Sequence, residues 1–565
     1  METIRDSAFG KLVRLCTRNR LLRYPEEIDP ALWTECLKPE PSVTDEEAAT
    51  LADTEADTFG LYAVMSQASR VSRRLSIAST AGVTGGTPLL VDWRSPDDPE
   101  NPQNWSTTKK LLVSSQIWLL TFSIYIGSAI YTPGIEGVSE QFGVSRVAAT
   151  LGLTLFVLGY GLDSTLTRYP RSNDLVPSLG APNRRPKPCI PPHARRLRLL
   201  PVRRHLRKEL RHAPGLPVHH RLSRLPSLAT GGASMGDMWN PKVRDYMIAI
   251  WGCFAISAPV LGPLVGGFAA SAKGWTWTIW QLLWASGFTL VLLFFFLPET
   301  FTPNILWRRA RRVRKITGNS NYKCEAEIEL SQVRPKDVLF EAAIRPFQLC
   351  FLEPIVFFLN LYISLIYGIL YIFFEAFPIV FSEIHGFNAG ETGLAFLGIL
   401  IGTFPTIIGY FFWKAKYQVR HFDANWNIAP EQQLPPTLVG AFALPISLFW
   451  FGWTGNFASV HWIVPIIASM FFSVGGCLIF NGIFCYQAHA YPRYAASVLA
   501  GNDFMRSSFG AGFPLFATAM FHNLGVGWAC TLLGCLTVLF VPYPFVLLRY
   551  GRRLRMASKF ARHDI

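Results

Sequence analysis

Ten stretches of the chain are each long and apolar enough to cross a lipid bilayer. About 20 helical residues, at a rise of ~1.5 Å per residue, span a hydrocarbon core of ~30 Å. Continuous apolar runs of this length favour helices over the shorter alternating strands of a membrane barrel. The sequence therefore predicts an all-α polytopic membrane protein. The runs cover residues of about 111–132, 147–162, 245–270, 276–297, 350–373, 392–413, 437–456, 462–485, 496–520 and 525–548.

The amino-acid composition agrees with this fold class. Of the 565 residues, 50% are apolar and only 16% are charged, whereas soluble proteins carry roughly 25% charged residues. This balance argues against a soluble globular enzyme and against a disordered chain. The 10 cysteines are scattered and form no C-x-x-C pair, so the sequence indicates neither a zinc site nor a disulfide framework.

Basic residues beside the apolar runs set the expected orientation, because Lys and Arg are retained on the cytosolic side of a membrane. Clusters of them precede the first run, follow the fourth and the sixth, and close the chain. A chain threaded from a cytosolic N-terminus places all of these clusters inside. The predicted parts are a polar cytosolic N-terminal tail (1–108), an N-terminal membrane half (109–297), a cytosolic central loop (298–346), a C-terminal membrane half (347–549) and a basic cytosolic C-terminal tail (550–565).

One segment, residues 163–226, departs from this pattern. It is rich in arginine and proline and carries most of the net charge of +15. It cannot cross a bilayer, because each central Arg or Lys costs at least ~2.5 kcal/mol and proline breaks the helix. Three interpretations stay open: a basic cytosolic loop, a nucleic-acid-binding insert, or a stretch translated out of frame or through a mis-assigned intron. The segment lacks the interleaved aromatic residues that stack on nucleic acids, and we expect no nucleic-acid partner.

Three short motifs carry a resemblance to a known family. Residues 98–106 read DPENPQNWS, residues 258–267 read APVLGPLVGG, and residues 298–306 read PETFTPNIL. They resemble motifs of fungal major facilitator superfamily transporters of the twelve-span drug:proton antiporter class, in the azole- and benomyl-resistance branch. The resemblance covers 98–162 and 227–565. It implies two pseudo-symmetric helical halves, with ten clear spans here and the third and fourth spans of the family replaced by the basic segment.

The second of these motifs resembles the G-x-x-x-G-P-x-x-G-G antiporter motif of the family's fifth span. Glycines let a neighbouring helix approach closely, and a proline within the helix removes one backbone donor and bends it. The resemblance implies a kinked interface that seals the transporter against leak. The residues at the motif positions are Ala258, which stands where the family has its first glycine, and Gly262, Pro263, Gly266 and Gly267.

Ionisable residues within membrane spans are candidates for proton exchange or gating, because burying them is costly. Glu353 and Glu375 fall near opposite ends of the run 350–373, and Asp503 and Arg506 lie three residues apart at the start of the run 496–520. A carboxyl group in a low-dielectric cavity holds its proton to higher pH, so Glu375 or Asp503 could exchange protons near neutrality. The alternatives are that Glu375 lies in the headgroup layer and that Asp503 and Arg506 form a structural ion pair.

Polar and aromatic residues within the C-terminal half could line a cavity for a flat apolar substrate, although such residues also serve simply in packing. The candidates for the cavity are Asn360, Tyr367, Tyr371, Asn481 and Gln487, with Tyr362 and Phe374 beside them.

The resemblance implies a plasma-membrane exporter of amphipathic small molecules that works by proton antiport, with both termini in the cytosol. Its halves would rock about a central site. We expect no enzymatic activity and no cofactor, the proton gradient being the energy source, and a monomer whose partners are the substrate, protons and the lipid bilayer. Two alternatives stay open: a defective or mis-annotated gene product that lacks two spans, and a membrane receptor or scaffold with a basic docking loop.

Overall fold

The computed structural model describes residues 2–29, 89–166, 227–332, 344–421 and 428–563, apart from Arg18 and Arg493, together with Leu32 and Phe340. Over these residues the chain is a bundle of long helices with one pair of two-residue strands. The predicted all-α polytopic class is confirmed. Of the anomalous segment 163–226, all but its first four residues lie outside the described part of the chain.

The helices before and after the central loop are called here the first and the second half of the bundle. The first half holds α6 (Thr107–Ala129), η4 (Thr132–Gly134), α7 (Ile135–Phe142), α8 (Arg146–Leu166), α11 (Ser227–Met238), α12 (Pro241–Lys273) and α13 (Thr276–Phe296). The second half holds α18 (Pro354–Phe377), η7 (Pro378–Ile384), α19 (Ala389–Ala395), α20 (Leu397–Lys416), η8 (Gln418–His421), η9 (Pro430–Gln433), α21 (Pro435–Gly455), α22 (Ile463–Ala490), α23 (Ala495–Phe540) and α24 (Pro542–Ala557).

Every predicted apolar run lies on helix. Within the described ranges, eight helical segments are long and apolar enough to cross a membrane, and the apolar stretch Arg146–Leu162 of α8 is shorter. The predicted runs 496–520 and 525–548 share one of the eight, Ser497–Ala557, which turns sharply at Gly525. The φ of 74° there is a conformation that glycine adopts at little cost.

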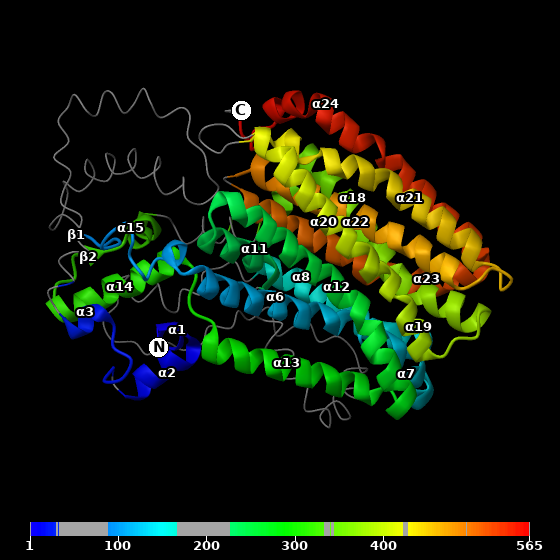
Figure 1. Cartoon of the computed structure of the whole chain (residues 1–565), viewed down its shortest axis with the longest axis horizontal. Helices are drawn as coiled ribbons and strands as arrows, with labels where there is room; N and C mark the ends of the chain where they lie inside the picture. Colours follow the sequence, from blue (N-terminus) through cyan, green and yellow to red (C-terminus); the bar gives the residue numbers. More distant parts are fainter. Residues whose placement is uncertain are drawn as a thin grey trace.

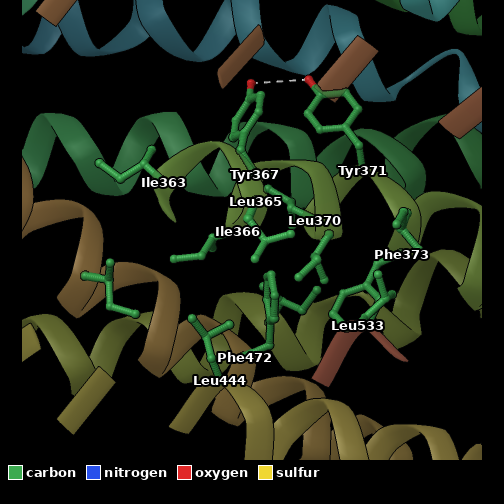
Figure 2. Close-up of a cluster of buried hydrophobic side chains, with 14 of the residues drawn as sticks. Ile363, Leu365, Ile366, Tyr367, Leu370, Tyr371, Phe373, Leu444, Phe472 and Leu533 are labelled. Carbon is green, nitrogen blue, oxygen red and sulfur yellow. Dashed lines mark hydrogen bonds between the residues drawn. The ribbon is translucent and has the colours of Figure 1, made fainter. Parts of the chain in front are cut away.

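Both termini lie at the same end of the bundle, which we call the tail side, and α7 and α19 lie at the opposite end, the far side (Figure 1). Helix α18 runs through the middle of the packed core. Its Ile366 and Leu370 point toward Leu444 of α21 and Phe472 of α22, as Figure 2 shows. Two tyrosines of the same helix point the other way, toward the first half. Helix α18 therefore joins the core of the second half to the interface between the halves.

On the tail side, the N-terminal tail and the central loop form one small unit, the tail–linker module. It comprises α1 (Glu2–Asp6), α2 (Ala8–Cys16), α3 (Pro25–Ile28), β1 (Leu89–Leu90), η3 (Pro102–Asn104), α14 (Thr302–Thr317), β2 (Tyr322–Lys323) and α15 (Glu325–Gln332). Strands β1 and β2 pair in parallel. A second linker helix, α17 (Arg345–Leu352), leads into α18.

Buried ion pairs hold this module together. The Arg309 guanidinium of α14 lies 2.7 Å from an Asp98 oxygen, and both side chains are fully buried. Arg312 lies 3.1 Å from Glu100 and also pairs with Glu26. Burial alone would raise the pKa of Asp98, but hydrogen bonds and charge from Arg309, together with two backbone N–H groups, outweigh it and lower that pKa. Two linker arginines that the sequence marks only as cytosolic charges thus bind the acidic residues of the DPENPQNWS motif.

Replacing Asp98 by alanine is expected to destabilise the module by about 2 kcal/mol, because it removes two charge-assisted hydrogen bonds from the buried Arg309, while Glu100 remains 3.2 Å from that guanidinium. Trypsin would then cleave the purified protein at the arginines of α14 faster than in the parent. The double variant Asp98→Ala, Arg309→Met removes both charges and is expected to recover most of the protection. Equal cleavage rates in the parent and the single variant would contradict this role.

Candidate functional site

A cavity of about 220 Å³ lies between the two membrane halves. The first half contributes α6, α11 and α12, and the second contributes α18, α20, α22 and α23. Most of the surface is apolar or aromatic, with a few polar groups. Pockets for drug-sized ligands are commonly ~300–1,000 Å³, so the cavity must widen to admit such a molecule. Its principal polar and aromatic residues are Tyr125, Asp245, Trp251, Tyr367, Phe480, Asn481, Phe484, His489, Asn502, Asp503 and Arg506.

The ion pair Asp503–Arg506 stands on the cavity wall. A guanidinium nitrogen of Arg506 donates to one oxygen of Asp503 and, at 3.0 Å, to the hydroxyl of Tyr125 in α6. The guanidinium also lies 4.8 Å from the ring centre of Tyr367. The second oxygen of Asp503, Oδ2, is buried and accepts no hydrogen bond from the described residues. The predicted pair is therefore formed, and Arg506 connects the two halves.

Three tyrosines form a hydrogen-bonded group beside this pair, and a fourth packs against it. Tyr160 of α8 lies 2.6 Å from Tyr367 and 3.2 Å from Tyr371, measured between hydroxyl oxygens. Tyr367 and Tyr371 lie 3.4 Å apart (Figure 2), and Tyr371 donates to Ser128 of α6 at 2.7 Å. Tyr125 packs edge-on against Tyr160. Of the predicted Tyr367 and Tyr371, the first lines the cavity and the second lies behind it.

The predicted amide residues are divided between the cavity and the core. Asn481 lines the cavity. Asn360 is fully buried. Its side-chain oxygen, Oδ1, accepts a hydrogen bond from Gln487 at 2.7 Å and one from the cavity residue Asn502 at 2.8 Å. Gln487 is itself fully buried. Asn360 and Gln487 therefore position Asn502 from behind instead of lining the cavity.

Glu375 is buried inside the protein near the end of α18, and the chain continues without a break into η7, which ends at Ile384. Its side chain is 2% exposed and lies 3.1 Å from the guanidinium of Arg146, at the start of α8. Thr518 of α23 donates to the same oxygen at 2.9 Å. Glu375 is therefore buried within the protein and joins the two halves toward the far side.

A second ion pair crosses between the halves toward the tail side. The ammonium group of Lys414, at the end of α20, lies 2.9 Å from Asp245, near the start of α12. Asp245 and His489 both line the cavity. Sequence reasoning missed this pair, since Lys414 follows an apolar run and resembles an ordinary flanking residue. Asp245, an ionisable residue at the border of the run 245–270, could have marked this position as a candidate site.

Glu353 lies away from the cavity, at the junction of α17 and α18. Ser558, just after α24, donates to one of its oxygens at 2.9 Å, and Tyr491 donates to the other at 3.3 Å. Nearby, Arg555 of α24 pairs with Glu431 at 3.1 Å. These contacts fasten the C-terminal tail to the second half and place Glu353 among anchoring residues.

The antiporter-motif residues lie where α12 meets two other helices. A methyl group added at Gly266 would come within 2.3 Å of the Ile130 carbonyl oxygen, just after α6. One added at Gly267 would come within 2.4 Å of the Ala389 carbonyl oxygen in α19. Gly266 therefore allows close packing within the first half, and Gly267 allows it between the halves.

The other motif residues contribute to the same contacts. Gly262 faces Ala129 and Ile130, where an added methyl group would come within 2.7 Å, and Ala258 is fully buried. Pro263 lies inside α12, and its carbonyl would be 2.8 Å from a methyl group added at Gly393, near the end of α19. The motif and the Arg146–Glu375 pair lie toward the far side, whereas the cavity lies toward the tail side.

Comparison with known proteins identifies the family. The family described as Major Facilitator Superfamily matches residues 226–514. The chain is 42% identical to Transporter mfs1 of Schizosaccharomyces pombe, over 84% of this chain and 88% of that protein. It is 40% identical to Fluconazole resistance protein 1 of Saccharomyces cerevisiae, over 86% of this chain and 87% of that protein.

Two further comparisons concern the full length and the fold. The chain is 32% identical to the Cycloheximide resistance protein of Candida maltosa, over 99% of each chain. The solved structure of the proton:xylose symporter XylE, bound to 6-bromo-6-deoxy-D-glucose, matches with a TM-score of 0.50 at 15% identity, over 79% of this chain and 96% of that one. That likeness shows a shared fold. With two helical halves around a central cavity, this chain belongs to the Major Facilitator Superfamily of membrane transporters.

Proposed function

We propose that the protein is a secondary active exporter of amphipathic small molecules that works by proton antiport. The observation that carries the proposal is the cavity between the halves, whose wall is aromatic and apolar except for a few polar groups, among them Asp503 and Arg506. Such a surface suits flat, partly polar molecules. Relatives named for resistance to fluconazole and to cycloheximide support the same class of substrate.

We propose that the protein lies in the plasma membrane and that both of its termini face the cytosol. The basic clusters before α6, in α14, at the end of α20 and in α24 lie on the tail side, in agreement with retention of Lys and Arg in the cytosol. In this orientation the cavity lies toward the cytosol, and the far side is the closed, extracellular side.

Proton coupling would occur at Asp503. Its oxygen Oδ2 is buried without a partner among the described residues and can accept a proton. Protonation weakens the attraction of Arg506, which keeps its hydrogen bond to Tyr125 and its place over the ring of Tyr367. A substrate that occupies the same wall would favour release of this proton into the cytosol. Drug and proton would then alternate in one cavity, as antiport requires.

The Arg146–Glu375 pair would stabilise closure of the extracellular side. Because Arg146 is 38% exposed, the pair is partly screened and worth roughly 1 kcal/mol. We expect Glu375→Gln to raise, about fivefold, the rate at which an impermeant thiol reagent modifies a cysteine placed at Thr150. The charge exchange Arg146→Glu, Glu375→Arg should restore the slow rate. A Glu375→Gln rate equal to that of the parent would contradict the closing role.

Accumulation of labelled fluconazole or cycloheximide in yeast cells that lack their own exporters tests the proposed function. Cells that express the protein should accumulate less drug, and a protonophore should abolish the difference. Equal accumulation with and without the protein would contradict export. An effect that survives the protonophore would contradict proton coupling.

Sequencing of the transcript across codons 163–226 separates this function from the defective-product alternative. A second frame that encodes two apolar spans would show that the written segment is an error and that the working protein has twelve spans. A docking role for the basic loop would instead require that a 163–226 peptide captures a partner while export is absent.

A further inference from the structure

Helix α2 (Ala8–Cys16) is amphipathic, and two of its faces are occupied. Gly10 packs against the backbone of α1, where an added methyl group would lie 2.0 Å from the carbonyl oxygen of Ile4. Arg14 is buried, pairs with Glu27 at 2.7 Å and donates to the Leu22 carbonyl at 2.6 Å. These contacts fix the rotation of α2 about its own axis.

The third face of α2 is apolar and exposed. Ala8, Leu12 and Leu15 share it at the i, i+4 and i+7 spacing of one helix face, and the two leucines are 50% and 77% exposed. In the turn that follows, Arg20 and Arg23 are exposed as well. A leucine face with exposed arginines nearby is typical of helices that lie in a membrane interface.

The position of α2 indicates what covers this face. Exposed apolar residues form a stripe along α13: Trp284, Phe288 and Val291 are 55%, 62% and 55% exposed. Phe295 continues this stripe one turn further on, and Phe9 of α2 covers it, with the ring centres 4.8 Å apart. In a membrane transporter, an exposed apolar stripe such as this one on α13 faces lipid. Helix α2 therefore lies at the end of the lipid-facing surface of α13.

The next residues place α2 at the membrane boundary. Glu299 follows α13 directly, and Lys11 of α2 lies 3.7 Å from its carboxylate. Figure 1 shows α1 and α2 beside the tail-side end of α13, while α3 and the strands lie further from the bundle. Helix α2 therefore lies at the tail-side end of the apolar stripe of α13.

We propose that α2 is an interfacial anchor that binds anionic phospholipids of the leaflet on the tail side. Leu12 and Leu15 enter the boundary between headgroups and acyl chains, and Arg20 and Arg23 attract acidic headgroups. That this leaflet is the cytosolic one rests on the orientation given under Proposed function. Binding would couple the tail–linker module, and through it the central loop, to the lipid composition.

The test uses the full-length protein in lipid nanodiscs, in a background without native cysteines. Spin labels go on Leu12→Cys, Leu15→Cys and, as a matched control, Ile28→Cys on α3, a residue that is also apolar and 69% exposed. In phosphatidylserine-containing discs we expect the labels at 12 and 15 to collide more with oxygen, which partitions into lipid, than with a water-soluble nickel complex. The label at 28 should show the opposite preference.

A second arm tests the charge. Each basic residue near an anionic surface raises the equilibrium constant for membrane binding about fivefold. The double variant Arg20→Gln, Arg23→Gln should therefore lower the equilibrium constant for insertion of α2 into anionic discs by roughly thirtyfold. Phosphatidylcholine discs should give the same weak immersion with or without added inorganic phosphate. The proposal would be overturned if, in anionic discs, the labels at 12 and 15 were as exposed to water as the label at 28. Drug export by such a protein would leave the proposed function intact.

Discussion

Replacement of Arg506 by methionine is expected to reduce drug export at least about a hundredfold, because removing one partner of a buried ion pair costs ~3–5 kcal/mol. Arg506 is 7% exposed and is the group through which Asp503 is tied to Tyr125 of the other half. Without it, Asp503 loses the ion-pair partner that ties it to Tyr125, and the two halves lose this contact. Labelled-drug transport by the reconstituted protein measures the effect.

Three further variants separate coupling from folding. Asp503→Asn keeps the shape of the site but cannot exchange a proton, so we expect loss of gradient-driven export with retained exchange of drug for drug. The double variant Asp503→Asn, Arg506→Met removes both charges and should fold at least as well as Arg506→Met alone. Arg420→Gln changes an exposed arginine in η8 and should export at the parental rate. Parental export by Arg506→Met would contradict the role of the pair.

Replacement of Gly267 by alanine is expected to shift the transporter away from the state that is closed on the far side. The new methyl group would meet the backbone of Ala389 across the interface between the halves, and backbone cannot move aside as a flexible side chain can. Overpacking of this kind costs ~1–3 kcal/mol, which changes the closing equilibrium roughly fivefold to a hundredfold. The thiol-modification rate of a cysteine at position 150 should rise accordingly.

Gly266→Ala provides the internal comparison, because its methyl group would meet Ile130 within the same half. It should lower the melting temperature of the protein without a specific opening of the far side. Gly287→Ala, in α13, has open space around the added methyl group and should change neither quantity. The same response from Gly266→Ala and Gly267→Ala would contradict a distinct role of Gly267 between the halves.

The fold class followed from the sequence because the apolar runs leave few alternatives in lipid. The motif at 258–267 likewise indicated close helix packing, and α12 does approach α6 and α19 at its glycines. Asp503 and Arg506 could be paired from their spacing alone, since residues three apart lie on one helix face. In each case local spacing carries the information.

Contacts between distant segments were beyond that reasoning. Arg146 and Lys414 look like ordinary flanking charges, and only folding brings them to Glu375 and Asp245. Tyr125 and Tyr160 could not be distinguished from packing residues, because hydrogen bonding between their helices and α18 depends on how the halves meet.

The most direct test of the account is transport in proteoliposomes across an imposed pH gradient. Labelled fluconazole should move against its own gradient when the compartment that receives drug is the more acidic one, and collapse of the pH gradient should stop this movement. Asp503→Asn should show no response to the gradient while still exchanging drug for drug. Drug movement by the intact protein that is indifferent to the imposed pH gradient would contradict proton antiport through the Asp503–Arg506 site.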